Sequence, residues 1–174
     1  MVEKRMRRWE VRQPRFLTFS CYQRLPLLGR AEWRDAFVES LGAARDRLGF
    51  RLIAWVVMPE HVHLIVVPGE RPIPGVLRAI KQPVAQRAIR RWKETDAKVL
   101  RRIAAGEGRY RYWQAGGGFD RNLRDQDDLA DKVAYVHHNP VKRGLVERET
   151  DWWWSSARWY AGERDGVLTI DPVG

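Results

Sequence analysis

The stretch VVMPEHVHLIVV, residues 56–67, decides the fold of this 174-residue chain. It reads as the end of one strand, a short turn at Pro59-Glu60, and a second strand over residues 61–67. A link this short joins two strands only when they run antiparallel. The sequence therefore predicts a hairpin that sets segments 51–58 and 61–67 side by side in one sheet.

His61 and His63 are the two residues that do not suit a buried strand. Residues i and i+2 project to the same side of a strand, so the two imidazoles point together while Val62 and Leu64 pack into the core. Two neutral imidazoles on one strand face make half of a metal site. The spacing favours a metal-binding pair, and the alternative is a pair of ordinary polar residues on a half-exposed strand.

The segments around the hairpin supply the rest of a fold. Aromatic and β-favouring residues predict strands over residues 15–22 and 109–114, and Gly49 suits the end of the helix that begins at residue 31. Further helices are expected over 74–103, with a break or kink at Pro83, and over 125–141, ending near Pro140. The order β-α-β-β-α-β-α is typical of an α+β, ferredoxin-like split β-α-β antiparallel sheet with an added C-terminal helix. We expect the helices on one face and the other face free for a ligand.

The amino-acid composition limits the class of molecule that this protein is expected to bind. The formal net charge of +10 indicates a polyanion, either nucleic acid or an anionic membrane surface. No apolar run approaches the roughly 20 residues of a membrane span, and a single cysteine fits a reducing cytoplasm. Nucleic acid in the cytoplasm is therefore the favoured partner.

Basic residues gather in two places, near the N-terminus and in the second long helical segment. They are candidates for phosphate contact, and the alternative for either cluster is a solvated surface. The candidates are Arg5, Arg7, Arg8 and Arg12 in the first cluster and Arg87, Arg90, Arg91 and Lys93 in the second.

Two polar side chains on the late helix complete a candidate site. Tyr135 and Asn139 lie one helical turn apart and share a face, with His138 close to it and His137 pointing elsewhere. On an isolated helix both would be ordinary residues. Beside a His-x-His strand, the Asn139 amide oxygen could bind a metal ion with the Tyr135 hydroxyl over the same ion.

Four motifs together carry a resemblance to a known family. MPEHVHLIV (58–66), RYWQ with GFD (111–120), YVHHNPVKRGLV (135–146) and WWWSSA (152–157) resemble the REP-associated tyrosine transposases. These form a branch of the single-tyrosine HUH transposases, named for their histidine-hydrophobic-histidine motif. The resemblance runs from about residue 14 to residue 160.

The resemblance implies roles for the candidate residues. It makes Tyr135 the nucleophile and His61, His63 and Asn139 the ligands of a divalent metal, Mg²⁺ or Mn²⁺, although ligand chemistry alone favours Mn²⁺ or Zn²⁺. It implies DNA transposition, in which single-stranded hairpin (REP-like) DNA is cut through a 5′-phosphotyrosine intermediate. The expected protein is a bacterial, cytoplasmic, nucleoid-associated monomer or homodimer without a membrane partner. It comprises a basic extension (1–14), a catalytic domain (15–146) and a Trp-rich extension (147–174).

Two other functions remain open at this point. One is a non-catalytic single-stranded nucleic-acid-binding protein that retains the fold. The other is a Zn-stabilised regulatory protein that uses His61, His63 and His138.

Overall fold

A computed structural model describes residues 13–116, 118–166 and 168–172, and the N-terminal arginine candidates lie outside these ranges. Its strands are β1 (Arg15–Ser20), β2 (Arg51–Val57), β3 (His61–Val67) and β4 (Phe119–Asn122). Its α-helices are α1 (Ala31–Leu48), α2 (Ile73–Glu94), α3 (Val99–Ile103), α4 (Gln126–Lys142) and α5 (Ala157–Tyr160), with short 3-10 turns η2 (Tyr22–Arg24) and η3 (Glu149–Asp151). Among these helices, none combines the length and apolar character that crossing a bilayer demands.

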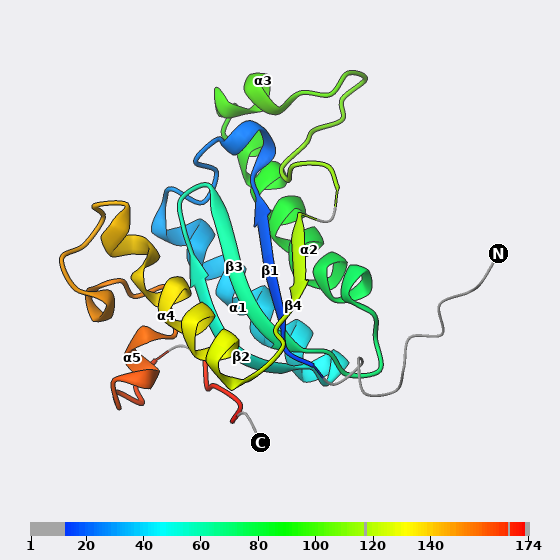
Figure 1. Ribbon diagram of the computed structural model, residues 1–174. Coiled ribbons are helices and arrows are strands. Elements are labelled where there is room, and N and C mark those ends of the chain that lie inside the picture. The colour runs from blue at the N-terminus through cyan, green and yellow to red at the C-terminus, as the bar shows by residue number, and fades with distance from the viewer. Residues whose placement is uncertain (1–12, 117, 167, 173–174) are drawn as a thin grey trace.

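The four strands form one sheet in the order β2-β3-β1-β4 (Figure 1). Every neighbouring pair is antiparallel, and β2 and β3 form the predicted hairpin around Pro59-Glu60. This order is that of a ferredoxin-like split β-α-β sheet. The fold class predicted from the sequence is therefore confirmed.

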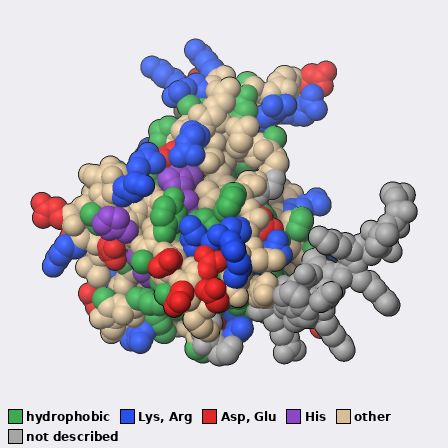
Figure 2. Space-filling view, viewed as in Figure 1, with side chains coloured by type: hydrophobic (Ala, Val, Ile, Leu, Met, Phe, Trp, Pro, Cys, Tyr) green, Lys and Arg blue, Asp and Glu red, His purple; other side chains and the backbone are tan. Residues whose placement is uncertain are grey.

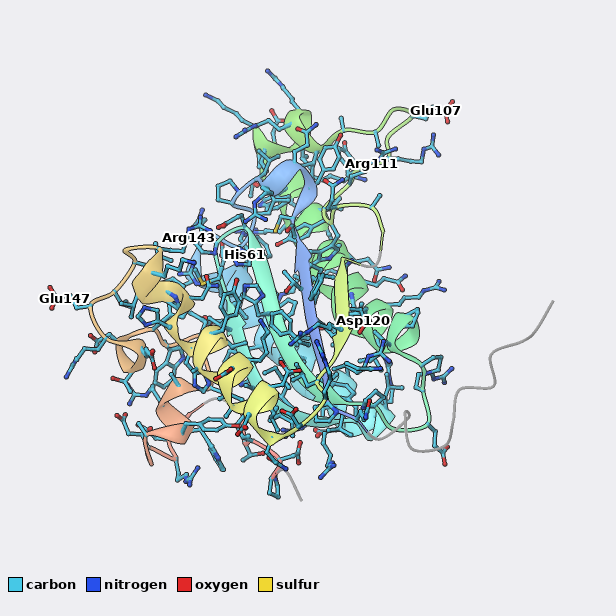
Figure 3. The ribbon with its side chains drawn as sticks, viewed as in Figure 1. His61, Glu107, Arg111, Asp120, Arg143 and Glu147 are labelled. Atoms are coloured by element: carbon cyan, nitrogen blue, oxygen red, sulfur yellow. The ribbon has the colours of Figure 1, made fainter. Side chains whose placement is uncertain are left out.

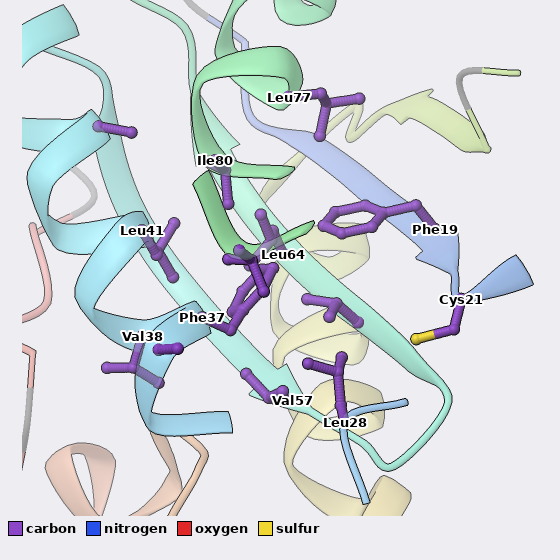
Figure 4. Packing of buried hydrophobic residues seen from close by; sticks show 14 of the residues in the cluster. Phe19, Cys21, Leu28, Phe37, Val38, Leu41, Val57, Leu64, Leu77 and Ile80 are labelled. Atoms are coloured by element: carbon purple, nitrogen blue, oxygen red, sulfur yellow. The ribbon is translucent and has the colours of Figure 1, made fainter. Parts of the chain in front are cut away.

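Helices α1 and α2 cover one face of the sheet and bury the larger core. Phe37 and Leu41 of α1 and Ile80 of α2 pack there against Val57 and Leu64 of the hairpin (Figure 4). Every residue of β3 is buried. The alternation along β3 sends Val62 and Leu64 into this core, as the period of a strand requires.

The opposite face of the sheet is not free, which corrects one expectation. Helix α4 packs on it, and Leu129 and Val136 join Phe16 and Ile65 in a second apolar cluster. In Figure 1, α4 lies over β2 and β3 and leaves the β1–β4 side open. The Phe119 side chain on that side is 53% exposed. The added helix thus covers half of the face that was expected to hold a ligand.

The fourth strand also lies later than predicted. The segment 109–114 makes only isolated bridges, such as Cys21 with Trp113, and the regular strand is β4. Its aromatic residues serve the core instead: Tyr112 stacks on Trp92 with 5.7 Å between ring centroids. Just before β4, Gly118 has a φ of 68°, and a Cβ there would overlap the carbonyl oxygen of Thr18. A glycine is therefore required where the chain joins β1.

Of the break or kink predicted at Pro83, the break does not occur. Helix α2 runs through this residue, and in the same turn the Ser40 hydroxyl of α1 donates a hydrogen bond of 2.7 Å to the Ile80 carbonyl oxygen. Proline removes one backbone donor from a helix, here the donor that would reach the Ala79 carbonyl oxygen, one residue before Ile80. The helical segment is divided later instead, between α2 and α3.

The C-terminal part of the chain runs along the outer edge of β2. Val57 N donates to Trp154 O, Ser156 N to Trp55 O and Asp171 N to Leu52 O, each at 2.9 Å. The Tyr160 hydroxyl also donates to Ile53 O, at 2.9 Å. These bonds pair backbone groups on the edge of β2 that faces away from β3.

Candidate active site

The histidine pair lies at the start of β3, on the side of the sheet that carries α4. His61 and His63 are each 4% exposed, and their Nε2 atoms lie 3.1 Å apart. The ring of Phe16 stacks on His63 with 5.5 Å between centroids, which closes one side of the pair. The two imidazoles are therefore held with their inner nitrogens facing each other.

The outer nitrogens of both rings have partners. His61 Nδ1 lies 3.0 Å from Glu60 Oε1, and His63 Nδ1 lies 2.7 Å from the hydroxyl oxygen of Thr18. Thr18 stands opposite His63 in the β1–β3 register. Donation from Nδ1–H to these oxygens leaves the lone pair on each Nε2. Such second partners fix the tautomer and orientation of metal-binding histidines.

Both imidazoles are neutral at physiological pH. The pKa of His63 is lowered to about 3, mainly by burial and to a smaller extent by the neighbouring His61 and Arg24. Burial also lowers the pKa of His61, although Glu60 opposes the shift. Two neutral rings thus direct two lone pairs at one small region, an arrangement that a cation relieves.

Asn139 brings a third group to the same place. Its Nδ2 lies 3.1 Å from His63 Nε2, and a half-turn of the amide places Oδ1 there instead. Ligands of an octahedral ion at about 2.1 Å lie about 3.0 Å apart when they are neighbours. The two spacings about His63 Nε2, to His61 Nε2 and to the Asn139 amide, therefore fit a divalent ion, whose remaining positions would be open to water or substrate.

Tyr135 lies beside this cluster, one turn before Asn139 on α4. Its ring centroid is 5.4 Å from that of His63 and 6.0 Å from that of Phe16. The side chain is 41% exposed, unlike the buried histidines. Its phenol is therefore open to a large substrate and adjacent to the candidate ligands.

The other four tyrosines are occupied elsewhere. The Tyr112 hydroxyl donates to Leu27 O, and that of Tyr160 to Ile53 O. Tyr22 accepts a hydrogen bond from Gln23, and Tyr110 lies under Lys93. None of these rings contacts the histidine pair in the part of the chain that the structure describes.

A buried carboxylate and two arginines border the pair. Glu60, 7% exposed, binds Arg143 at 2.7 Å and Arg24 at 3.4 Å as well as His61. Burial alone would raise the pKa of Glu60, but His61 and Arg143 outweigh it and lower that pKa. Figure 3 shows Arg143 next to His61, and in Figure 2 basic side chains border the histidines at this position. The site is therefore rimmed with positive charge.

The predicted basic cluster on α2 lies apart from this site, because α2 covers the opposite face of the sheet. Its members are at the surface. Arg87 pairs with Glu39 at 2.8 Å, Arg91 with Glu94 at 3.6 Å, and Lys93 lies over the Tyr110 ring; Arg90 is exposed. Any contact that these side chains make with a polyanion is distant from Tyr135.

The remaining two histidines do not join the pair. His137 is buried and its Nε2 lies 2.7 Å from the Ser156 hydroxyl, whereas His138 is exposed and lies 3.1 Å from Glu149. Within residues 13–172, apart from the two gaps, no three His, Cys, Asp or Glu side chains gather to hold a metal. A zinc site built from His61, His63 and His138 is therefore wrong.

Three residues of the site were not predicted from the sequence. Glu60 precedes His61 directly, and Arg143 continues the Tyr135–Asn139 spacing by another turn, so both were readable as neighbours of the motifs. Thr18 carries no such signal, because only the register between β1 and β3 brings it to His63.

Comparison with known proteins finds named relatives, although no family model matches the chain. A REP-associated tyrosine transposase of Escherichia coli is 32% identical over 132 residues, covering 75% of this chain. A Haemophilus influenzae protein that provisionally carries the same name is 25% identical over 127 residues, covering 72%. The chain spans 66% of the length of either relative.

A solved structure described as a REP-associated tyrosine transposase bound to a REP hairpin shares the fold. It aligns with a TM-score of 0.64 at 24% identity, covering 93% of this chain and 86% of its own. The named relatives, the shared fold and the ordered motifs lead to one conclusion. The chain belongs to the REP-associated tyrosine transposases.

Proposed function

We propose that this protein is a metal-dependent single-stranded DNA endonuclease and strand transferase that acts on hairpin, REP-like DNA in transposition. The observation that carries the proposal is the exposed Tyr135 phenol beside two buried, neutral imidazoles whose lone pairs converge. The relatives' names support the reaction class, and the net charge of +10 supports a polyanionic substrate. A REP hairpin is the ligand of the structural neighbour, and we extend that ligand class to this chain.

Tyr135 supplies the attacking atom in this proposal. Its phenolic oxygen bonds to phosphorus, the bond from phosphorus to the 3′-oxygen breaks, and the leaving oxygen takes a proton while the phenol loses one to solvent. The products are a 5′-phosphotyrosine and a free 3′-hydroxyl. Because the phosphotyrosine is again a diester, another 3′-hydroxyl can attack it, release Tyr135 and join a new strand.

His61, His63 and Asn139 are the residues that would hold the divalent ion. When bound, the ion would neutralise phosphate charge and orient the diester for in-line attack. By accepting hydrogen bonds from Nδ1–H, Thr18 and Glu60 would hold the two imidazoles in the required tautomer. The buried position of the pair under Phe16 limits their rotation and so fixes the direction of the lone pairs.

The deciding experiment is a covalent-adduct assay. Incubation of the wild-type protein with end-labelled single-stranded hairpin DNA and Mg²⁺ or Mn²⁺ should give a species that survives boiling in detergent. Its mass should equal that of the protein plus the 3′-side DNA fragment. Tyr135→Phe keeps the ring and the packing but removes the attacking oxygen, so it should bind the hairpin and give no adduct.

Tyr160→Phe is the matched control, since it removes a hydroxyl whose partner is the backbone of β2. It should form the adduct at the wild-type level. Hairpin binding without any adduct from the wild type would instead favour the non-catalytic binding protein. Mapping of the adduct to a tyrosine other than Tyr135 would overturn the assignment of the nucleophile.

A further inference from the structure

Lys132 occupies an unusual place on α4. It lies three residues before Tyr135 and so shares its helix face. Its ammonium nitrogen is 5.1 Å from the centroid of the Tyr135 ring and 5.3 Å from that of Phe16. Aromatic faces attract an ammonium group, so the two rings hold this charge beside the phenol and the histidine pair.

The same ammonium has no carboxylate partner. Of the acidic groups that the structure describes, none lies within 4.0 Å of it, whereas the neighbouring Arg15 and Arg121 pair with Asp120 and Asp128. Asp128, one turn before Lys132, is already occupied by Arg121 and by the backbone N–H of Arg124 at 3.1 Å. A half-buried cation is thus positioned next to a proposed nucleophile with its charge unmatched.

A phosphodiester under attack presents the matching charge. Negative charge spreads over the equatorial oxygens of phosphorus in the transition state, and a fixed ammonium stabilises it by charge-assisted hydrogen bonds. A lysine suits this task because its three donors rotate around a compact charge.

We propose that Lys132 is a catalytic residue that binds a non-bridging oxygen of the scissile phosphate while Tyr135 attacks. It forms no covalent bond and transfers no proton. The inference rests on the proposed function and adds to it a phosphate contact on the Tyr135 side of the site. The metal ligands would face a different oxygen of the same phosphate.

The test removes the charge from each side of the contact in turn. Adduct formation is timed for the wild type and for Lys132→Met, Lys132→Arg and Lys142→Met, the last being the same change elsewhere on α4. Each is given hairpin DNA with a normal diester, or with one or the other methylphosphonate diastereomer, at the cleavage position. A methylphosphonate replaces one charged oxygen by a methyl group.

Lys132→Met should slow cleavage of the diester about 100-fold, the usual effect of losing one oxyanion donor. On one methylphosphonate diastereomer, the Lys132→Met variant and the wild type should cleave at rates within a few-fold of each other. On the other diastereomer the variant should remain much slower than the wild type. Lys132→Arg should retain most activity on the diester, and Lys142→Met should match the wild type on all three substrates.

The remaining outcomes separate the two proposals. A wild type that forms no adduct would overturn the proposed function and this assignment with it. An active wild type, together with an equal loss by Lys132→Met on all three substrates, would mean that Lys132 acts on the phenol or on packing. No loss on the diester would show that the ammonium does not contact the phosphate. Either of these two results overturns the Lys132 assignment alone.

Discussion

Two buried histidine environments in this molecule differ in one respect that matters. His61 and His63 are each 4% exposed and His137 is 5% exposed, and burial lowers the pKa of all three. The Nε2 of His137, however, has a hydroxyl partner in Ser156, while the Nε2 atoms of the pair face each other. Burial and a shifted pKa therefore do not distinguish a site from a core residue. The convergence of two ring nitrogens and the Asn139 amide at one place does.

The largest expected contrast concerns cleavage. His63→Ala should abolish adduct formation, because the candidate ion loses a ligand, while hairpin affinity persists through phosphate contacts elsewhere. His137→Gln, which can still reach Ser156, should cleave at a rate close to that of the wild type. Gel assays of adduct and of hairpin binding check both variants. Wild-type cleavage by His63→Ala with added Mn²⁺ would remove the distinction between the two environments.

The hydroxyl partners of His63 and His137 give a second contrast. Thr18→Val keeps the shape of the side chain but removes the hydroxyl at His63 Nδ1, and should weaken Mn²⁺ binding about 10- to 100-fold. Ser156→Ala removes the partner of His137 and should leave Mn²⁺ affinity unchanged, at a cost of about 1–3 kcal/mol in the free energy of unfolding. Titration calorimetry and urea unfolding measure the two quantities. Equal effects of both variants on Mn²⁺ affinity would contradict the assignment.

Acid should destabilise the protein through its buried histidines. The pKa of His137 falls from 6.5 to about 4 on folding, so protonation favours the unfolded chain. This stabilising contribution is complete above about pH 6.5 and is lost as the pH falls towards 4, reaching a loss of about 2 kcal/mol at pH 5. Urea unfolding of wild type and His137→Gln at pH 7.5 and pH 5 should show a smaller acid effect in the variant. An identical acid effect in both proteins would mean that His137 does not remain neutral in the fold.

The smallest effect belongs to the basic surface on α2. If Arg90 contacts one DNA phosphate, Arg90→Ala should reduce the slope of log affinity against log salt by about 0.7 for single-stranded DNA. The cleavage rate at saturating DNA should not change, because α2 lies on the other face of the sheet. Fluorescence anisotropy at several salt concentrations gives the slope. An unchanged slope would mean that Arg90 contacts no phosphate and that this cluster is an ordinary solvated surface.

The sequence predicted those parts of the fold and site that depend on local periodicity. The period of two placed His61 and His63 on one side, and the helical period brought Tyr135 and Asn139 together. The hairpin and the strand order followed from turn lengths and from the order of the elements. The ligand and nucleophile roles came from the family resemblance and stay predictions.

The missed features depend on long-range packing. Phe119–Asn122 is a strand although FDRN has little strand preference, because the close approach at Gly118 sets it against β1. RYRYWQ has strong strand preference, yet its rings pack against Trp92. Thr18 reaches His63 only through the β1–β3 register, which no local pattern determines. Lys132 was readable from its spacing to Tyr135, but only the missing carboxylate partner singles it out.

The C-terminal segment along β2 has a consequence for the solubility of shortened versions of the protein. Trp154, Ser156, Tyr160 and Asp171 pair with backbone groups on the outer side of β2, a strand whose side chains are almost all buried. Ending the chain at residue 146 would expose a flat, apolar sheet edge, the surface through which molecules of one protein join into aggregates. Such a fragment should precipitate or assemble into β-rich particles, even though it keeps every residue assigned to the site.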